Sequence, residues 1–174
     1  MILKFYELNK IDILKQNFFL FYGNNEGLKK EEIVKLHSKS KKKIFKFEEK
    51  KILENEEDFF NDIYSGSLFE NEKFIIINHA TEKILKIIET LLEKKIMDVC
   101  ILINAGQLDK KSKLRSTFEK NKELTAVAFY PDNNETLSKL TQKFIKEKKI
   151  NLSQMNINFI VNKCNGNREF LNNE

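Results

Sequence analysis

FFLFYGNNEG, residues Phe18–Gly27, is the stretch that decides the fold of this chain. Its first half is a run of five large apolar or aromatic residues, and its second half consists of turn formers around two glycines. An apolar run of strand length that stops at glycine and asparagine predicts a buried strand. Strands buried on both faces are typical of a parallel sheet covered by helices, so the stretch predicts an α/β fold.

Further segments of strand length follow along the chain. Most are continuous apolar runs, but residues 43–47 alternate, which indicates a strand nearer the edge of the sheet. The predicted strands are residues 18–22, 43–47, 74–78, 99–103 and 126–130. Apolar residues recur three and four positions apart in residues 84–97, 110–122 and 133–148, as in amphipathic helices. Alternating strands and helices predict a three-layer parallel sheet with helices on both faces.

The character of the sequence changes beyond Lys149. Ser153 is expected to cap a helix that runs through Val161, and Gly166-Asn167-Arg168 interrupts it before a further helical segment from Phe170. We therefore expect an α/β domain at residues 1–150. Residues 151–174 are expected to be the start of a second, helical domain that is cut off.

Composition narrows the class of protein. The chain has 174 residues, of which 41% are hydrophobic, and this is enough to form the core of an ordinary domain. No stretch has the 18 or so apolar residues that a membrane-spanning helix needs, so we expect a cytoplasmic protein without membrane contact. Cys100 and Cys164 lack metal-type spacing, and the only histidines are His37 and His79. We expect neither a metal site nor a disulfide framework, and we interpret Cys100 as a core residue.

The glycines of the opening stretch stand where an α/β nucleotide-binding domain carries its phosphate loop. Such a loop needs wider glycine spacing than Gly23 and Gly27 have, then a lysine and a Ser or Thr, whereas Leu28-Lys29 follows here. No predicted strand ends in an acidic pair for magnesium. We interpret Gly23, Glu26 and Gly27 as a degenerate phosphate-loop position that binds no nucleotide and no other cofactor. A nucleotide hydrolase with a degenerate loop stays open as an alternative.

Other polar candidates have simpler interpretations. His79 lacks an assignable Ser or Cys nucleophile, so we interpret it as an exposed or hydrogen-bonded residue. Ser112 and Ser116 flank Arg115 in what we expect to be a basic helix with Asp109 at its start. Residues 39–51 carry seven lysines and two glutamates, which could contact phosphates or form a solvated surface. A basic nucleic-acid-binding module is therefore a further alternative.

Leu68 and Phe69 are two large apolar residues within residues 64–72, a stretch otherwise made of turn formers and charged residues. Burying each would stabilise the fold by roughly 2 kcal/mol, so exposing them would need a reason. The pair either packs the preceding helix against the sheet or is presented to a partner as an apolar anchor. The residues alone leave both interpretations open.

Several segments taken together resemble the delta subunit of the bacterial DNA polymerase III clamp loader. The matching segments, in order and spacing, are residues 18–28, 67–77, 103–115, 126–132 and 165–171. The resemblance implies an AAA+ type domain that lacks ATPase residues, followed by a small helical lid domain and a collar domain. The lid motif, here Asn165-Gly166-Asn167-Arg168, is a looser version of the family's pattern.

What the resemblance implies about function is specific. Subunits of this family take part in DNA replication by binding the ring-shaped sliding clamp, beta, and holding one of its interfaces open. Companion subunits, gamma or tau and delta prime, bind and hydrolyse ATP, so no catalysis is expected of this chain itself. The family's clamp-binding element maps onto Leu68 and Phe69, with Ser67 before them. DNA would be contacted through the assembled complex.

The length of the family's subunits adds a further expectation. They extend well beyond this sequence, so the collar and most of the lid would be absent from it. Such a fragment would bind the clamp without assembling stably with the other loader subunits.

Overall fold

The computed structural model describes residues 2–10, 16–40, 42–65, 72–94, 96 and 99–173. Contacts between residues divide the chain into two units. Unit 1 consists of Met1–Gly23 with Glu32–Ala128, and unit 2 consists of Asn24–Glu31 with Phe129–Glu174. The expected domain boundary near residue 150 stays a prediction. By contacts, the helix that ends at Lys148 groups with the two helices that follow it.

Unit 1 contains a parallel sheet, which in the described residues has six strands in the order β1-β6-β2-β5-β4-β3. The strands are β1 (Ile2–Lys4), β2 (Phe18–Tyr22), β3 (Lys43–Glu48), β4 (Lys73–Ala80), β5 (Val99–Ala105) and β6 (Leu124–Ala128). All five residues of β2 are buried, as the apolar run predicts. The alternating strand β3 lies at the edge of the sheet, which was also predicted.

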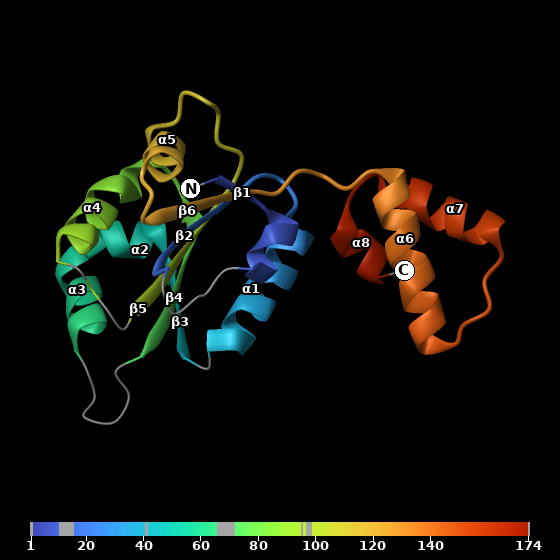
Figure 1. Ribbon diagram of the computed structural model, residues 1–174, viewed down its shortest axis with the longest axis horizontal. Helices are drawn as coiled ribbons and strands as arrows, with labels where there is room; N and C mark the ends of the chain where they lie inside the picture. Colours follow the sequence, from blue (N-terminus) through green and yellow to red (C-terminus); the bar gives the residue numbers. More distant parts are fainter. Residues whose placement is uncertain are drawn as a thin grey trace. The chain divides into compact units, whose positions relative to one another are not determined.

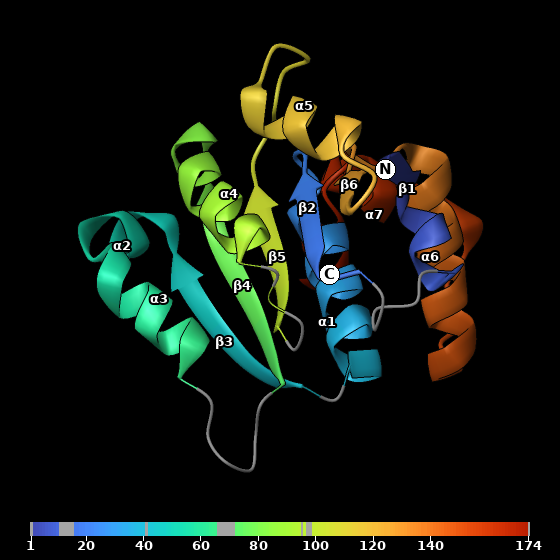
Figure 2. The same ribbon diagram turned by 60° about the vertical axis from the view of Figure 1, so that its left-hand side comes forward.

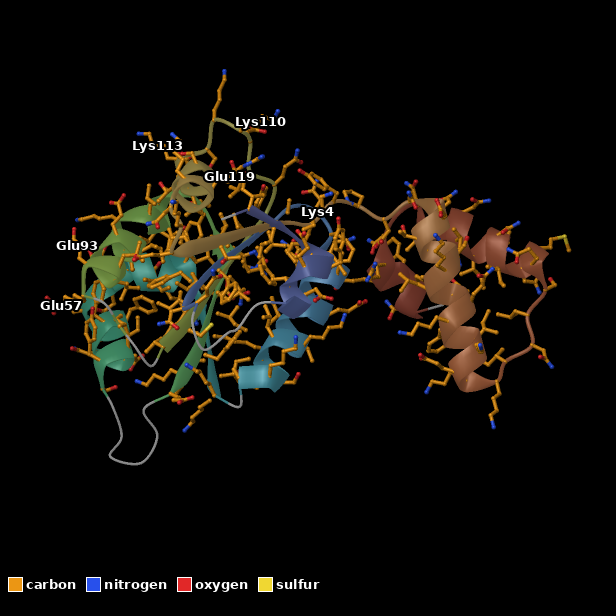
Figure 3. The ribbon with its side chains drawn as sticks, in the orientation of Figure 1. Lys4, Glu57, Glu93, Lys110, Lys113 and Glu119 are labelled. Atoms are coloured by element: carbon orange, nitrogen blue, oxygen red, sulfur yellow. The ribbon has the colours of Figure 1, made fainter. Side chains whose placement is uncertain are left out.

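Helices cover both faces of this sheet. They are α1 (Glu26–Ser40), which belongs to unit 1 from Glu32 onward, α2 (Glu49–Glu54), α3 (Glu56–Tyr64), α4 (Leu85–Glu93) and α5 (Lys113–Lys120), with short 3-10 helices η1 (Phe5–Lys10) and η2 (Glu82–Ile84). Figures 1 and 2 show α1 on one face and α2, α3 and α4 on the other. Glu57 and Glu93 point outward from α3 and α4 (Figure 3). The predicted three-layer α/β fold is therefore confirmed.

The two faces of the central strand β2 build separate parts of the core. Phe18, Leu20 and Tyr22 belong to one buried cluster together with side chains of α2, α3, α4 and α5. Phe19 and Phe21 point to the other face and are fully buried. On that face His37 of α1 packs edge-on against Phe74 of β4, with ring centroids 5.5 Å apart. Burial of each large side chain contributes roughly 1.5–3 kcal/mol.

Unit 2 is helical beyond Phe129. Its helices are α6 (Asn134–Lys148), α7 (Gln154–Cys164) and α8 (Arg168–Asn173). Leu137 of α6 packs with Ile157, Val161 and Cys164 of α7 in a small buried cluster. Ser153 caps α7 as predicted, because its hydroxyl accepts a hydrogen bond from the N–H of Asn156 at 3.2 Å.

Several predicted boundaries are wrong, among them those of β6, α5 and α8. Strand β6 runs from Leu124 to Ala128, two residues earlier than expected, because the fully buried Thr125 belongs to the sheet although it is polar. Helix α5 begins at Lys113, and its cap is Ser112 instead of Asp109, since the Ser112 hydroxyl accepts from the N–H of Arg115. Helix α8 begins at Arg168 and not at Phe170.

Candidate functional site

The residues expected to bind a clamp, Ser67, Leu68 and Phe69, lie outside the described residues. Their neighbours in the sequence are described. Helix α3 ends at Tyr64 and strand β4 begins at Lys73, so the three residues belong to the connection between α3 and β4. Their role as a partner-binding element stays a prediction.

The degenerate phosphate-loop position lies between β2 and α1. Gly23 has a φ of 121°, a conformation that glycine adopts readily, and it turns the chain out of the strand. In a phosphate loop the backbone N–H groups converge on the phosphates. Here the N–H of Gly23 donates to the carbonyl of Gly106 at 2.9 Å, and the N–H of Glu26 donates to the carbonyl of Asn24 at 3.1 Å. These two donors are therefore used within the chain.

Asn25 closes the start of α1. Its side-chain oxygen accepts from the N–H of Leu28 at 3.1 Å, as an N-cap does, and its carbonyl accepts from the N–H of Lys29 at 3.0 Å. Its side-chain nitrogen donates to the carbonyl of Tyr130 and to a carboxylate oxygen of Asp132, both at 2.9 Å. Asn25 is buried. It thus joins the first turn of α1 to the segment that precedes α6.

Gly27 and Lys29 have structural roles at the same position. A Cβ atom on Gly27 would lie 3.1 Å from the Glu169 side chain and 3.2 Å from that of Arg168, so the glycine allows α8 to approach α1 closely. The Lys29 ammonium, which is buried, forms an ion pair with Glu26 at 2.7 Å. Gly27 is therefore required for the close packing of α8 on α1, and Lys29 neutralises the carboxylate of Glu26.

Arg168 is the centre of a buried charged cluster in unit 2. Its guanidinium donates to both carboxylate oxygens of Asp132, at 2.9 and 2.8 Å, and to Glu31 at 2.8 Å. Burial alone would raise the pKa of Asp132, but hydrogen bonds from Arg168 and Asn25 outweigh it and lower that pKa. Burial would likewise lower the pKa of Arg168, but the hydrogen bond to Asp132 and the negative charges nearby raise it.

The turn before Arg168 explains the Asn165-Gly166-Asn167-Arg168 motif. Asn165 and Gly166 have φ values of 44° and 77°, and a Cβ on Gly166 would lie 2.8 Å from the carbonyl oxygen of Asp132. Only glycine fits this close approach. The turn formed by this motif therefore positions Arg168 to pair with Asp132. The sequence reasoning missed this role, although an arginine after a glycine turn was the available signal.

A cavity of about 230 Å³ adjoins this cluster. It is lined by Asn24, Asn25, Glu26, Pro131 and residues 165–169. Its lining offers amide groups, two glutamates and an arginine whose donors already bind carboxylates. A triphosphate needs free cationic donors, and this lining does not supply them.

A larger cavity of about 580 Å³ lies at the ends of β4 and β5 in unit 1. Residues at its wall include His79, Glu82, Gln107, Asp109 and Ser112. His79 has a φ of 53° and an exposed side chain, and its Nε2 lies 3.7 Å from a carboxylate oxygen of Glu48. The Ser112 hydroxyl caps α5. His79 is therefore exposed as predicted, and the described contacts give it no nucleophile to activate.

The lysines of residues 39–51 are not gathered on one surface element. They extend from the end of α1 through β3 into α2. Lys42 is buried, the Lys43 ammonium lies 5.8 Å from the centre of the Phe45 ring, and Lys50 pairs with Glu54 at 3.9 Å. Another set of lysines, which includes Lys110 and Lys113, projects around the start of α5 (Figure 3).

Within residues 2–10, 16–40, 42–65, 72–94, 96 and 99–173, no group of three or more His, Cys, Asp or Glu side chains is placed to hold a metal ion. Among the helices of the same residues, none is long and apolar enough to cross a membrane. Cys100 is buried, as predicted, and burial raises the pKa of its thiol to about 12.

Comparisons with known proteins give matches in structure alone. Neither a family model nor a curated protein sequence matches the chain. The clamp loader delta protein of Bacillus subtilis is similar over 96% of this chain and 54% of its own length, with a TM-score of 0.59 and 14% identity. Domain III of the Thermotoga maritima replication initiation protein DnaA is similar over 97% of this chain and 78% of its own, with a TM-score of 0.56 and 14% identity.

These likenesses agree with the resemblance seen in the sequence, at the level of the fold. The chain spans about half the length of the clamp loader delta protein that it matches. Its parallel sheet and flanking helices form an α/β fold that is similar to the folds of both replication proteins.

Proposed function

We propose that the chain is a clamp-loader subunit of the delta type. It binds a sliding clamp through Leu68 and Phe69, with Ser67 before them, and helps to hold the clamp open for loading onto DNA. It acts beside the gamma or tau and delta prime subunits, which hydrolyse the ATP. DNA is contacted through the assembled complex, in the cytoplasm.

The observation that carries this proposal is the sequence position of an apolar pair in this fold. Leu68 and Phe69 fall in the connection between α3 and β4 of a domain similar to the clamp loader delta protein over 96% of the chain. Large apolar anchors supply most of the energy of many protein interfaces. An exposed pair at this connection would suit a pocket on a partner.

The start of α1 supports a role without ATP hydrolysis. The N–H groups of Gly23 and Glu26 donate within the chain, and Asn25 caps the helix. Arg168, the arginine nearest this position, is paired with Asp132 and Glu31. Phosphoryl transfer depends on charged groups free to hold phosphate and magnesium. We therefore expect no heat and no rise in the unfolding temperature when magnesium ATP is added.

Calorimetric titration with the sliding clamp encoded by the same genome tests the proposal. Replacing both Leu68 and Phe69 by Ala is expected to weaken binding by about 3–4 kcal/mol if both are hot spots. The matched control replaces Met155 and Phe159 by Ala, an exposed apolar pair one helical turn apart on α7. Equal clamp affinity in the parent and the Leu68/Phe69 variant would refute the assignment.

A further inference from the structure

Lys73, the first residue of β4, reaches back to the end of α3. Its side chain is buried, with 7% of its surface exposed. The ammonium donates to the carbonyl oxygen of Ser65 at 2.6 Å, to that of Ile63 at 3.3 Å, and to that of Asp62. One cation thus binds three carbonyl oxygens of residues 62–65, at the end of a helix.

This arrangement follows from the chemistry of a helix end. The last carbonyl groups of a helix lack partners inside it, and they carry partial negative charge that favours a cation. A buried ammonium in turn needs acceptors for its protons. Ser65 is also held by its own N–H, which donates to the carbonyl of Asn61 at 2.7 Å. Lys73 and Ser65 together close the end of α3.

Glu72, the residue before Lys73, contacts the start of β3 and the residue that precedes it. The carbonyl of Glu72 accepts from the N–H of Lys43 at 3.4 Å. Its carboxylate lies 4.0 Å from the ammonium of Lys42, whose side chain is buried. Ser65 and Glu72, the described residues on either side of residues 66–71, are therefore both fixed to the α/β framework.

We propose that Lys73 is a positioning residue for clamp binding. Its ammonium ties the end of α3 to the start of β4, and so it fixes the two points between which Leu68 and Phe69 are connected. This inference rests on the proposed function. Fixing the ends of a binding segment in the free protein reduces the ordering that must occur on association, which strengthens binding without adding a contact.

The first experiment compares Lys73→Met with Lys46→Met. Methionine retains a flexible apolar stem and removes the ammonium, and Lys46 is an exposed lysine on the adjacent strand β3. Hydrogen exchange and clamp affinity are measured in both variants. We expect Lys73→Met to speed exchange at the amide of Ser65 and to weaken clamp binding on the order of 10-fold, through lost pre-organisation. The Lys46→Met variant should change neither, and unchanged exchange or unchanged affinity in Lys73→Met overturns the inference.

A double-mutant cycle separates positioning from a general loss of stability. If Lys73 acts through the apolar pair, Lys73→Met should have no further effect on affinity once Leu68 and Phe69 are both Ala. Equal losses in the two backgrounds would overturn the inference. If the Leu68/Phe69 variant itself binds the clamp as the parent does, the proposed function fails and the role of Lys73 in it fails too.

A second substitution at Lys73 keeps the inference testable if the Lys73→Met variant does not fold. Lys73→Arg retains a charged donor at the same position. It should bind the clamp more tightly than Lys73→Met, or bind when Lys73→Met does not fold. Loss of clamp binding in a folded Lys73→Arg variant, as large as the loss caused by the Ala pair, would overturn the role of the donor.

Discussion

The guanidinium of Arg168 holds both carboxylate oxygens of Asp132, with Nε 2.9 Å from Oδ2 and Nη2 2.8 Å from Oδ1. The two residues are 36 positions apart, and the side chains of both are less than 10% exposed. A parallel pair of charge-assisted hydrogen bonds is the strongest geometry that these groups can form. The pair links α8 to the segment before α6.

Removal of the Arg168 guanidinium should destabilise unit 2. In Arg168→Met the carboxylate of Asp132 stays buried and loses its main partner, which is expected to cost about 3 kcal/mol in the free energy of unfolding. Urea unfolding followed by circular dichroism measures the change. The control is Lys139→Met, which removes an exposed pair with Glu135 on α6 and should change stability little. Similar midpoints for the two variants would contradict the prediction.

The same pair should make unfolding depend on pH in the acid range. The pKa of Asp132 is lowered from an ordinary value of 3.8, so the unfolded state binds more protons there and stability rises with pH. The contribution is complete above that ordinary value and is lost as the pH falls through the lower pKa of the folded protein. Asp132→Asn should therefore flatten the dependence of stability on pH below about 4. Parallel curves for parent and variant between pH 2.5 and 6, chosen as roughly the accessible acid range, would count against the ion pair.

Gly27 and Gly106 should respond differently to alanine. A Cβ at Gly27 meets α8 at 3.1–3.2 Å, whereas a Cβ at Gly106 meets nothing within 4 Å. We expect Gly27→Ala to destabilise the protein by about 1–2 kcal/mol through overpacking. Gly106→Ala should be neutral or slightly stabilising, since it reduces the freedom of the unfolded chain. If Gly27 served a ligand instead of packing, both variants would unfold at the same denaturant concentration.

The cysteines should be inert in the folded protein. Cys100 is fully buried in β5, and burial raises the pKa of its thiol to about 12, so little thiolate exists at neutral pH. Cys164 is buried in α7. An aromatic disulfide reagent at pH 8, roughly the ordinary thiol pKa, should label neither thiol until denaturant is added. Rapid labelling of Cys100 before unfolding would show that the sheet opens locally.

The strands were predictable where apolarity was continuous. The runs in β2, β4 and β5 identify their strands because both faces of each are buried, and Asn133 and Ser153 mark the starts of α6 and α7. The predicted range of strand β6 was two residues too late, because Thr125 is polar and was not counted in the apolar run although it is buried in the sheet. Strand β1 was missed, because three residues are too few for a periodic signal.

The candidate site was less predictable, because its contacts join residues far apart in the sequence. The sequence alone shows that the residues after Gly27 depart from the phosphate-loop pattern. The pairing of Arg168 with Glu31, 137 positions away, could not, since no local pattern encodes a partner at that distance. Phe144 shows the same limit. It is one of the apolar residues that recur at helical spacing in residues 133–148, yet its side chain is 53% exposed.

Unit 2 is assembled from two pieces of chain that are separated in the sequence by residues 32–128 of unit 1. Residues 24–31 supply Asn25, Gly27 and Glu31, and the later piece supplies Asp132 and Arg168. During synthesis Asn25 and Glu31 are made long before Asp132 and Arg168. Their contacts with these two residues therefore cannot form until α8 has been synthesised. A peptide of residues 129–174 would therefore contain the three helices and the Arg168–Asp132 pair, but it would lack the contacts that Glu31 and Asn25 make with that pair.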